Sequence, residues 1–293
     1  MPSRPIALLA LLAVSPALSF GDDDPLRTAS LGSASVVRPT GSTPAVDQPS
    51  EQSDVGPVMT ADALTGEQAR AFQLQTLYAA AEVLDGVESY TAELTKQERI
   101  DGELTGRQRI TFKQRYAPFS VYMKWKSGDR GREAIYVDGA NDNRTVVHAG
   151  GWKARFLPVL TIDPQGSLAM GESRHPITKA GLRNIVTRWI TAREADAPGA
   201  GTTYRVEADS FEGAACHKLT AEYIAPATDP TYRKVIVWID ATRMIPVAAV
   251  NYGWGEDDAS TLLERYEYRD IDTDAGLADI DFDRSNRRYS FKK

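Results

Sequence analysis

The sequence predicts an α+β fold in which a single curved antiparallel β-sheet carries an N-terminal helix and an inserted helix. Three observations predict it. Apolar residues alternate with polar ones along most segments after residue 89, two segments show helical spacing instead, and Asp-Gly or Gly-Gly pairs separate several alternating segments. Period-two alternation is typical of antiparallel strands with one buried face, whereas a parallel sheet would alternate its strands with helices along the chain.

The first predicted helix covers residues 68–85. Its apolar side chains recur at intervals of three and four residues and would form one stripe, which consists of Ala71, Leu74, Leu77, Tyr78, Ala81 and Leu84. Thr65 and Gln68 have the spacing of a capping box at its start, and Gly86 stands where a helix commonly ends.

The alternating segments begin at residues 90–94, where Tyr90, Ala92 and Leu94 would share the buried face of a strand. The other predicted strands cover residues 109–116, 119–126, 133–138, 144–149, 152–157, 204–209, 218–224, 233–240, 246–252 and 261–271. Together they make about ten strands. Phe282, near the end of the chain, is predicted to pack as a last plug.

A second helix interrupts these strands. Residues 156–176 are rich in proline and glycine and are predicted to be irregular, and the helix is predicted to start with Thr178 as its cap. Its apolar stripe consists of Leu182, Ile185, Val186, Trp189 and Ile190. Its other face carries Lys179, Arg183, Arg188 and Arg193. We interpret this basic face as a solvated helix surface, with contact to anionic lipid head groups as the alternative.

The apolar face of such a sheet is larger than two short helices can cover. The sheet could close into a barrel, or it could stay open with the helices as a lid over a cavity for a long apolar ligand. We favour the open half-barrel, because the second helix interrupts the strands midway, where a lid would lie. The residues predicted to line the cavity are Phe112, Val121, Met123, Trp125, Leu182, Ile185, Trp189, Val206, Val237 and Ile239.

The first 21 residues have the features of a secretory signal peptide. Arg4 precedes a short apolar run, and small residues precede a cut after Ser19 or, alternatively, after Gly21. That run is too short to span a bilayer, so the chain is expected to be cleaved and to reside in the periplasm or outside the cell. Residues 22–63 are polar, proline-rich and free of aromatic residues, which predicts a disordered linker before a folded domain at 64–293.

The composition restricts the chemistry. The formal charge is −6, and nucleic-acid binding is not expected because it needs a basic face. Cys216 is the only cysteine, which excludes an internal disulfide and a cysteine-based zinc site, and it is expected to be a buried thiol. The three histidines (His148, His175 and His217) are dispersed, and no nucleophile elbow, dinucleotide fingerprint or phosphate loop occurs. The sequence therefore predicts no catalytic residue, no metal and no cofactor.

Several motifs resemble families of exported proteins. Similarity to the secreted domain-of-unknown-function 1571 family rests on residues 90–99 (YTAELTKQER), 118–124 (PFSVYMK), 150–153 (GGWK) and 175–178 (HPIT). A weaker resemblance to outer-membrane lipoprotein-sorting (LolA-like) proteins rests on residues 238–240 (WID), 245–247 (IPV), 266–268 (YEY) and 281–283 (DFD). The LolA-like resemblance implies a half-barrel with a helical lid and a cavity that shields acyl chains in the periplasm.

Three functions follow as hypotheses. The leading one is a periplasmic, non-enzymatic binder or carrier of lipid acyl chains or of a lipidated protein, gated by the second helix. The second is an envelope sensor or interaction module that uses the same fold to contact an envelope protein, and the third is an unrecognised hydrolase. Lipid extraction from the purified protein, a pull-down from envelope extract and an esterase screen would separate them.

Overall fold

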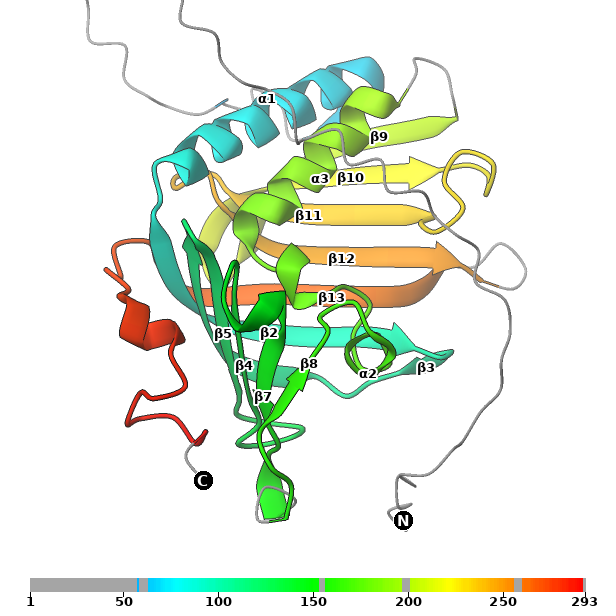
Figure 1. Ribbon diagram of the computed structural model, residues 1–293. Helices are drawn as coiled ribbons and strands as arrows, with labels where there is room; N and C mark the ends of the chain where they lie inside the picture. The colour runs from blue at the N-terminus through cyan, green and yellow to red at the C-terminus, as the bar shows by residue number, and fades with distance from the viewer. Residues whose placement is uncertain (1–56, 58–62, 153–155, 197–200, 256–259, 292–293) are drawn as a thin grey trace, which may run out of the picture. The chain divides into compact units, whose positions relative to one another are not determined.

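In the computed structural model, the thirteen β-strands of the described residues form one antiparallel sheet, and helices cover one of its faces (Figure 1). The structure describes residue 57 and residues 63–152, 156–196, 201–255 and 260–291. The predicted signal peptide (1–21) lies outside the described residues, and so does the predicted linker (22–63) apart from residues 57 and 63. Among the described residues, none of the helices combines the length and the apolar character that a membrane span requires.

The described helices are α1 (Gly66–Asp85), α2 (Ser167–Met170) and α3 (Leu182–Ala195). The strands are β1 (Ala63–Thr65), β2 (Ser89–Ile100), β3 (Glu103–Leu104), β4 (Gln108–Tyr116), β5 (Phe119–Trp125), β6 (Glu133–Val137), β7 (Thr145–His148), β8 (Leu160–Ile162), β9 (Thr202–Phe211), β10 (Ala214–Tyr223), β11 (Lys234–Asp240), β12 (Pro246–Trp254) and β13 (Ser260–Asp272). Short 3₁₀ turns include Asn141–Asn143, Ile177–Lys179 and Asp279–Phe282.

The strand order is β1-β9-β10-β11-β12-β13-β2-β4-β5-β6-β7-β8, with β3 paired to β2 outside this path. Because β1 and β8 stand at the two ends of the order, the described strands form an open sheet, which confirms the prediction of an open form over a closed barrel. The pairing of β13 with β2, in which Tyr268 lies opposite Leu94, joins the two halves of the sheet. In Figure 1, β4 and β5 run steeply across the direction of β10 to β12, so the sheet is strongly curved.

Helix α1 confirms the first predicted helix, but it buries a different face. Ala71 and Tyr78, which the predicted stripe contains, are exposed. Gln73 is buried instead, and its Nε2 donates hydrogen bonds to the backbone oxygens of Arg205 (3.1 Å) and Thr220 (2.8 Å). A polar side chain can face a sheet when strand carbonyls accept its hydrogen bonds, and apolar spacing alone does not reveal such partners.

Both predicted helix starts need correction. Thr65 precedes α1, but its side chain makes no capping hydrogen bond. Helix α3 starts at Leu182, whereas Thr178, the predicted cap, lies in the preceding 3₁₀ turn. The residue before α3 is Gly181, which has a φ of 101° and where a Cβ atom would collide with the side chain of Gln114. Glycine fixes this start because other residues rarely adopt such a backbone conformation.

One predicted strand, residues 152–157, is also wrong at its described positions. Trp152 lies in a 3₁₀ turn, Phe156 and Leu157 lie in a turn and a bend, and all three are exposed, while residues 153–155 lie outside the described residues. The next strand along the sheet is β8, which pairs with β7. It lies within the proline-rich segment that the sequence predicts to be irregular. A strand of three residues is too short to show a clear alternation.

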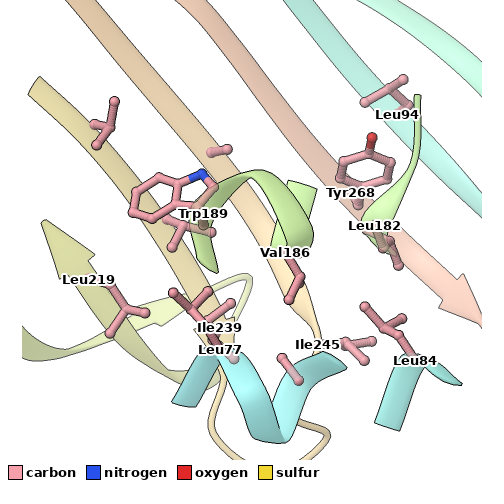
Figure 2. Packing of buried hydrophobic residues seen from close by; sticks show 14 of the residues in the cluster. Leu77, Leu84, Leu94, Leu182, Val186, Trp189, Leu219, Ile239, Ile245 and Tyr268 are labelled. Carbon is pink, nitrogen blue, oxygen red and sulfur yellow. The ribbon is translucent and has the colours of Figure 1, made fainter. Parts of the chain in front are cut away.

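The main apolar core lies between the sheet and the two longer helices, on the face that we call the inner face. Figure 2 shows how Leu77 of α1, Val186 and Trp189 of α3, and Ile239 of β11 come together there. Tyr90, Phe112, Leu219 and Val237 from the strands belong to the same cluster. Most of the strand side chains that the alternation predicts to be buried therefore do lie on the inner face.

A second, smaller core lies on the outer face, where the sequence predicts solvent. Tyr122 of β5 is buried there and stacks on Tyr289, with ring centroids 4.1 Å apart and planes 11° apart. Phe282 and Phe291 belong to the same cluster, which confirms that Phe282 packs as a plug near the end of the chain. The C-terminal segment thus covers the outer face of β5 to β7. The alternation of apolar and polar residues along a strand does not reveal such a cover.

Candidate functional site

A groove of about 420 Å³ runs beside α3, over the inner face of the sheet. Helix α3 forms one side, and residues of β10, β11 and β12 with the loop before β11 form the rest. The apolar residues that line it are Ile185, Trp189, Ala192, Ala195, Val235 and Ala249. Ligand pockets of roughly 300–1,000 Å³ with a mostly apolar lining are typical of small-molecule sites, and this groove falls within that range.

The groove stays open because small side chains face it from both sides. Ala192 projects from α3, and Ala249 lies on β12, opposite Val237 of β11 and Tyr266 of β13. The methyl groups of Ala192 and Ala249 are too short to fill the space between α3 and the sheet. The indole of Trp189 spans that space at another point along the helix. The period-two alternation of β12 therefore places a small residue where the neighbouring strands carry large ones.

A buried arginine stands at one end of the groove. Arg193 lines the groove, is 0% exposed, and has its guanidinium carbon 5.3 Å and 5.7 Å from the ring centroids of Tyr204 and Tyr223. Its Nη2 donates a hydrogen bond to the Tyr223 hydroxyl, and its Nε lies 3.3 Å from Oδ2 of Asp196. The predicted solvated basic face is therefore wrong at Arg193, because aromatic side chains of β9 and β10 enclose the last turn of α3.

Tyr223 is a neutral partner for this guanidinium. Burial raises the pKa of Tyr223 to about 12, although the charge of Arg193 acts in the opposite direction. The phenol thus keeps its proton near neutral pH, and it accepts the arginine hydrogen bond without supplying a countercharge. The nearby anion is Asp196, whose carboxylate forms the ion pair described above.

A polar cluster stands at the other end, around the buried carboxylate of Glu264. Oε1 accepts hydrogen bonds from Nδ2 of Asn251 (2.7 Å) and from the Tyr232 hydroxyl (3.0 Å). Oε2 lies 2.8 Å from Nε2 of His175 and 3.1 Å from Nε of Arg174. Burial alone would raise the pKa of Glu264, but the bonds from His175 and Asn251 and the charge of Arg174 outweigh burial and lower it to about 2.

A second buried carboxylate, Glu98, adjoins the first. It accepts hydrogen bonds from the hydroxyl of Tyr266, from Nζ of Lys96 (3.0 Å) and from the backbone nitrogen of Arg174 (3.2 Å). Burial and the two nearby carboxylates raise the pKa of Tyr266 well above its ordinary value, so this phenol stays protonated and donates. Lysine and arginine thereby offset the repulsion that two adjacent carboxylates would otherwise cause.

The register explains why these groups meet. Asn251 lies opposite Glu264, and Glu264 lies opposite Glu98, so the three form one polar row across β12, β13 and β2. Asn251 lines the groove as well, and so do Tyr232 and Arg188. The arrangement is therefore an apolar groove with a buried guanidinium at one end and a polar wall at the other, which suits binding of an amphiphile.

The ten residues predicted to line a cavity occupy one region but only partly the groove. Ile185 and Trp189 line it. The others form the core beneath it or pack against that core, and these are Phe112, Val121, Met123, Trp125, Leu182, Val206, Val237 and Ile239. Among the described residues, no group of three or more His, Cys, Asp or Glu side chains is placed to hold a metal ion.

Sequence reasoning missed the polar row and the buried arginine, although the strands carry a signal for the row. Lys96 and Glu98 continue the inward-facing series that starts at Tyr90, and Glu264 precedes Tyr266 and Tyr268 in the same way. Charged residues on an inward-facing register point to a buried polar site. No comparable signal marks Arg193, which lies within the basic face of α3.

Comparison with protein families adds an assignment. The model of the family described as "Protein of unknown function (DUF1571)" matches residues 87–291, well over half of the chain. The chain belongs to this family. The sequence motifs that resemble the DUF1571 family are thereby confirmed, and the matched region contains the whole groove as well as the polar row. No curated protein matches the chain.

Solved structures also show likeness to this DUF1571 protein. They include a putative outer-membrane lipoprotein-sorting protein domain from Vibrio parahaemolyticus, with 12% identity, a TM-score of 0.33, and coverage of 73% of this chain and 97% of that one. Lipoprotein LppX from Mycobacterium tuberculosis has 14% identity, a TM-score of 0.37, and coverage of 68% and 94%. A LolA superfamily protein from Nitrosomonas europaea has 11% identity, a TM-score of 0.30, and coverage of 71% and 96%.

Proposed function

We propose that this protein binds the acyl chain of a lipid, or of a lipidated protein, in the groove beside α3 and carries it without covalent chemistry. The observation that carries the proposal is the groove itself, about 420 Å³ in volume and lined by apolar side chains of α3, β11 and β12. Burial of an acyl chain releases about 0.8 kcal/mol per methylene, so a long chain can be held by apolar contact alone.

In this proposal α3 acts as a gate. It is fastened to the body near both of its ends: Nη2 of Arg183 donates to the backbone oxygen of Leu84, and Nη2 of Arg70 donates to the backbone oxygens of Arg193 and Asp196. All of these hydrogen bonds join α1 to α3 or to its C-terminal end, so the two helices would move together. Gly181, immediately before α3, supplies a backbone position with unusual freedom at one end of the gate.

The proposed place of action is the periplasm or the cell exterior. It rests on the signal-peptide features of residues 1–21, with residues 22–63 as a tether and residues 64–293 as the binding domain. A carrier in this compartment would shield acyl chains from water between membranes. A non-enzymatic role fits a groove whose polar side chains at both ends, apart from Nη1 of Arg193 and Oδ1 of Asn251, form hydrogen bonds or ion pairs with one another.

A second candidate function is contact with an envelope protein. The observation that favours it is a set of exposed apolar side chains between β7 and α3, namely Trp152, Phe156, Leu157, Leu160 and Leu168. Exposed apolar groups that gather in one segment are typical of interaction surfaces. A pull-down from envelope extract with the unmodified protein and with Phe156→Ser would test it, and equal recovery of partners by both would contradict it.

The binding proposal is tested by lipid recovery and by filling the groove. Mass spectrometry of an organic extract of the purified mature protein should detect bound lipid, and a fluorescent fatty acid should bind. Ala192→Phe should weaken that binding by about tenfold or more, because the ring would occupy the groove. The matched control is Ala71→Phe on the exposed face of α1, which should bind normally. Absence of lipid together with absence of fatty-acid binding would contradict the proposal.

A further inference from the structure

We propose that Arg193 receives the oxygen-bearing head of the acyl ligand, so that a carboxylate or carbonyl oxygen accepts a hydrogen bond from its Nη1. This inference rests on the proposed function, because it names the chemical class of ligand that the groove beside α3 takes. The ligand would be an acyl compound with an acceptor oxygen at the Arg193 end of the groove and its chain along Trp189 and Ile185.

The hydrogen bonding of Arg193 is incomplete. A guanidinium has five N–H groups and no acceptor. Nη2 donates to Tyr223, and Nε forms an ion pair with Asp196 that lacks hydrogen-bond geometry. Nη1 is buried and has no hydrogen-bond partner among the described residues. A charged donor that is fully desolvated and unpaired is costly, and a ligand oxygen at this position would remove that cost.

The unpartnered donor of Arg193, rather than an excess of positive charge around it, favours an acceptor at this position. Arg70 reaches the same helix end and donates to the backbone oxygens of Arg193 and Asp196. Asp196 pairs with Arg193, Oε2 of Glu67 lies 3.9 Å from Nη1 of Arg70, and Asp229 also lines the groove, so carboxylates balance the two guanidinium charges at this end. A carboxylate placed at Nη1 gains a charge-assisted hydrogen bond from the guanidinium, whereas an ammonium group at the same position would be repelled by it.

The opposite end of the groove is less suited to the same head. Arg188 lines that end, but it is exposed and its Nη2 donates to the Tyr232 hydroxyl (3.3 Å), so water can accept from its remaining N–H groups. Asn251 also lines that end, and its Nδ2 already donates a hydrogen bond to Oε1 of Glu264. Because an ionised carboxylate only accepts, the amide must present Nδ2 to it and keep Oδ1, an acceptor without a partner among the described residues. An acceptor head placed beside Asn251 would meet another acceptor, whereas Nη1 of Arg193 is a buried donor without a partner among the described residues, so the head is directed to Arg193.

The ligand experiment uses the unmodified mature protein and needs no variant. The neutral dye N-phenyl-1-naphthylamine reports occupancy, and palmitate, methyl palmitate and hexadecylammonium compete with it below their micelle concentrations. Palmitate should displace the dye at a concentration about tenfold or more lower than hexadecylammonium. Competition by palmitate alone assigns the head to a free fatty acid, whereas equal competition by the ester assigns it to an acyl carbonyl, as in a lipidated protein. Equal displacement by palmitate and hexadecylammonium overturns the inference and leaves acyl binding intact, whereas no displacement by any of the three overturns both.

Substitutions then locate the effect. Arg193→Met should abolish the preference for palmitate over hexadecylammonium while the neutral dye still binds, and Arg193→Lys should retain part of the preference. The matched control is Arg205→Met, which removes an exposed arginine of β9 outside the groove and should keep the preference. Circular dichroism reports whether each variant is folded. A preference that survives undiminished in folded Arg193→Met overturns the assignment. If that variant does not fold, an undiminished preference in Arg193→Lys overturns it, and so does the absence of a preference in the unmodified protein.

Discussion

Nε2 of His175 lies 2.8 Å from Oε2 of Glu264. This contact connects the loop that leads into α3 with β13, and it belongs to the polar row that walls one end of the groove. A side chain from an irregular segment thus holds the approach to the proposed gate against the sheet. Because a carboxylate only accepts hydrogen bonds, Nε2 is the ring nitrogen that carries the proton in this contact.

The first prediction concerns the pH dependence of stability that Glu264 confers. Its folded pKa of about 2 lies below the ordinary value of 4.5, and its side chain is 1% exposed. A lowered pKa stabilises the fold fully above the unfolded value, and the stabilisation is lost as pH falls from there toward about 2. We expect a loss of about 3 kcal/mol over that range, measured as the urea unfolding free energy.

The matched variants for this prediction are Glu264→Gln and Glu103→Gln. Glu264→Gln should be less stable near neutral pH and should show a flatter dependence between about pH 5 and pH 2. Glu103 is exposed on β3, so Glu103→Gln should follow the unmodified protein throughout. Parallel curves for Glu264→Gln and the unmodified protein would contradict the prediction.

The second prediction concerns the thiol of Cys216. It is 2% exposed, and burial together with the charge of Asp240 raises its pKa to about 11. Because the thiolate is the reactive form, we expect iodoacetamide to leave the native protein unlabelled near neutral pH and to label it once urea unfolds the chain. Mass spectrometry measures the adduct. Labelling of the native and unfolded states at similar rates would show the burial to be wrong.

The third prediction concerns the cover on the outer face. Phe282 is 4% exposed, and the guanidinium of Arg115 lies 5.1 Å from its ring centroid. Phe282→Ala should lower the unfolding free energy by about 3–5 kcal/mol, since it removes a buried aromatic ring. Ile280, on the same turn, is 50% exposed, and Ile280→Ala should change it by less than about 0.5 kcal/mol. Similar effects of both substitutions in chemical denaturation would refute the outer-face core.

The fourth prediction concerns the start of α3. Gly181→Ala introduces a Cβ atom against Gln114 at a positive φ, so it should cost at least about 1–3 kcal/mol of unfolding free energy from backbone strain. Gly106 has open space around it and no positive φ, and Gly106→Ala should be nearly neutral. Thermal unfolding of the two variants measures the difference. An equally small shift for both would mean that the backbone before α3 does not require glycine.

Local patterns predict the parts of this fold that depend on neighbouring residues. The alternation through Tyr90, Ala92 and Leu94 is sufficient to place β2 and its buried face, and the helical spacing is sufficient to find α1 and α3. Alternation does not say what covers the second face of a strand, so the packing of Tyr289 on Tyr122 could not be predicted. That contact depends on a segment far along the chain.

The same limit applies to the candidate site. Helical spacing assigns Arg193 to a polar face, and only the tyrosines of β9 and β10 make that position buried. Trp189 and Ile185 were within reach of prediction because they belong to the apolar stripe of α3. The polar row required knowledge of the register that sets Asn251, Glu264 and Glu98 side by side.

The pairing of β13 with β2 also determines when this protein can fold. Glu93 lies opposite Arg269, so the centre of the sheet cannot assemble until the polypeptide is available as far as β13. Sheets dominated by contacts between distant residues fold slowly, commonly in milliseconds to seconds. During that interval the unpaired edges of β2 and β12 are open to pairing with other chains, and a cell that makes this protein has to protect them until β13 arrives.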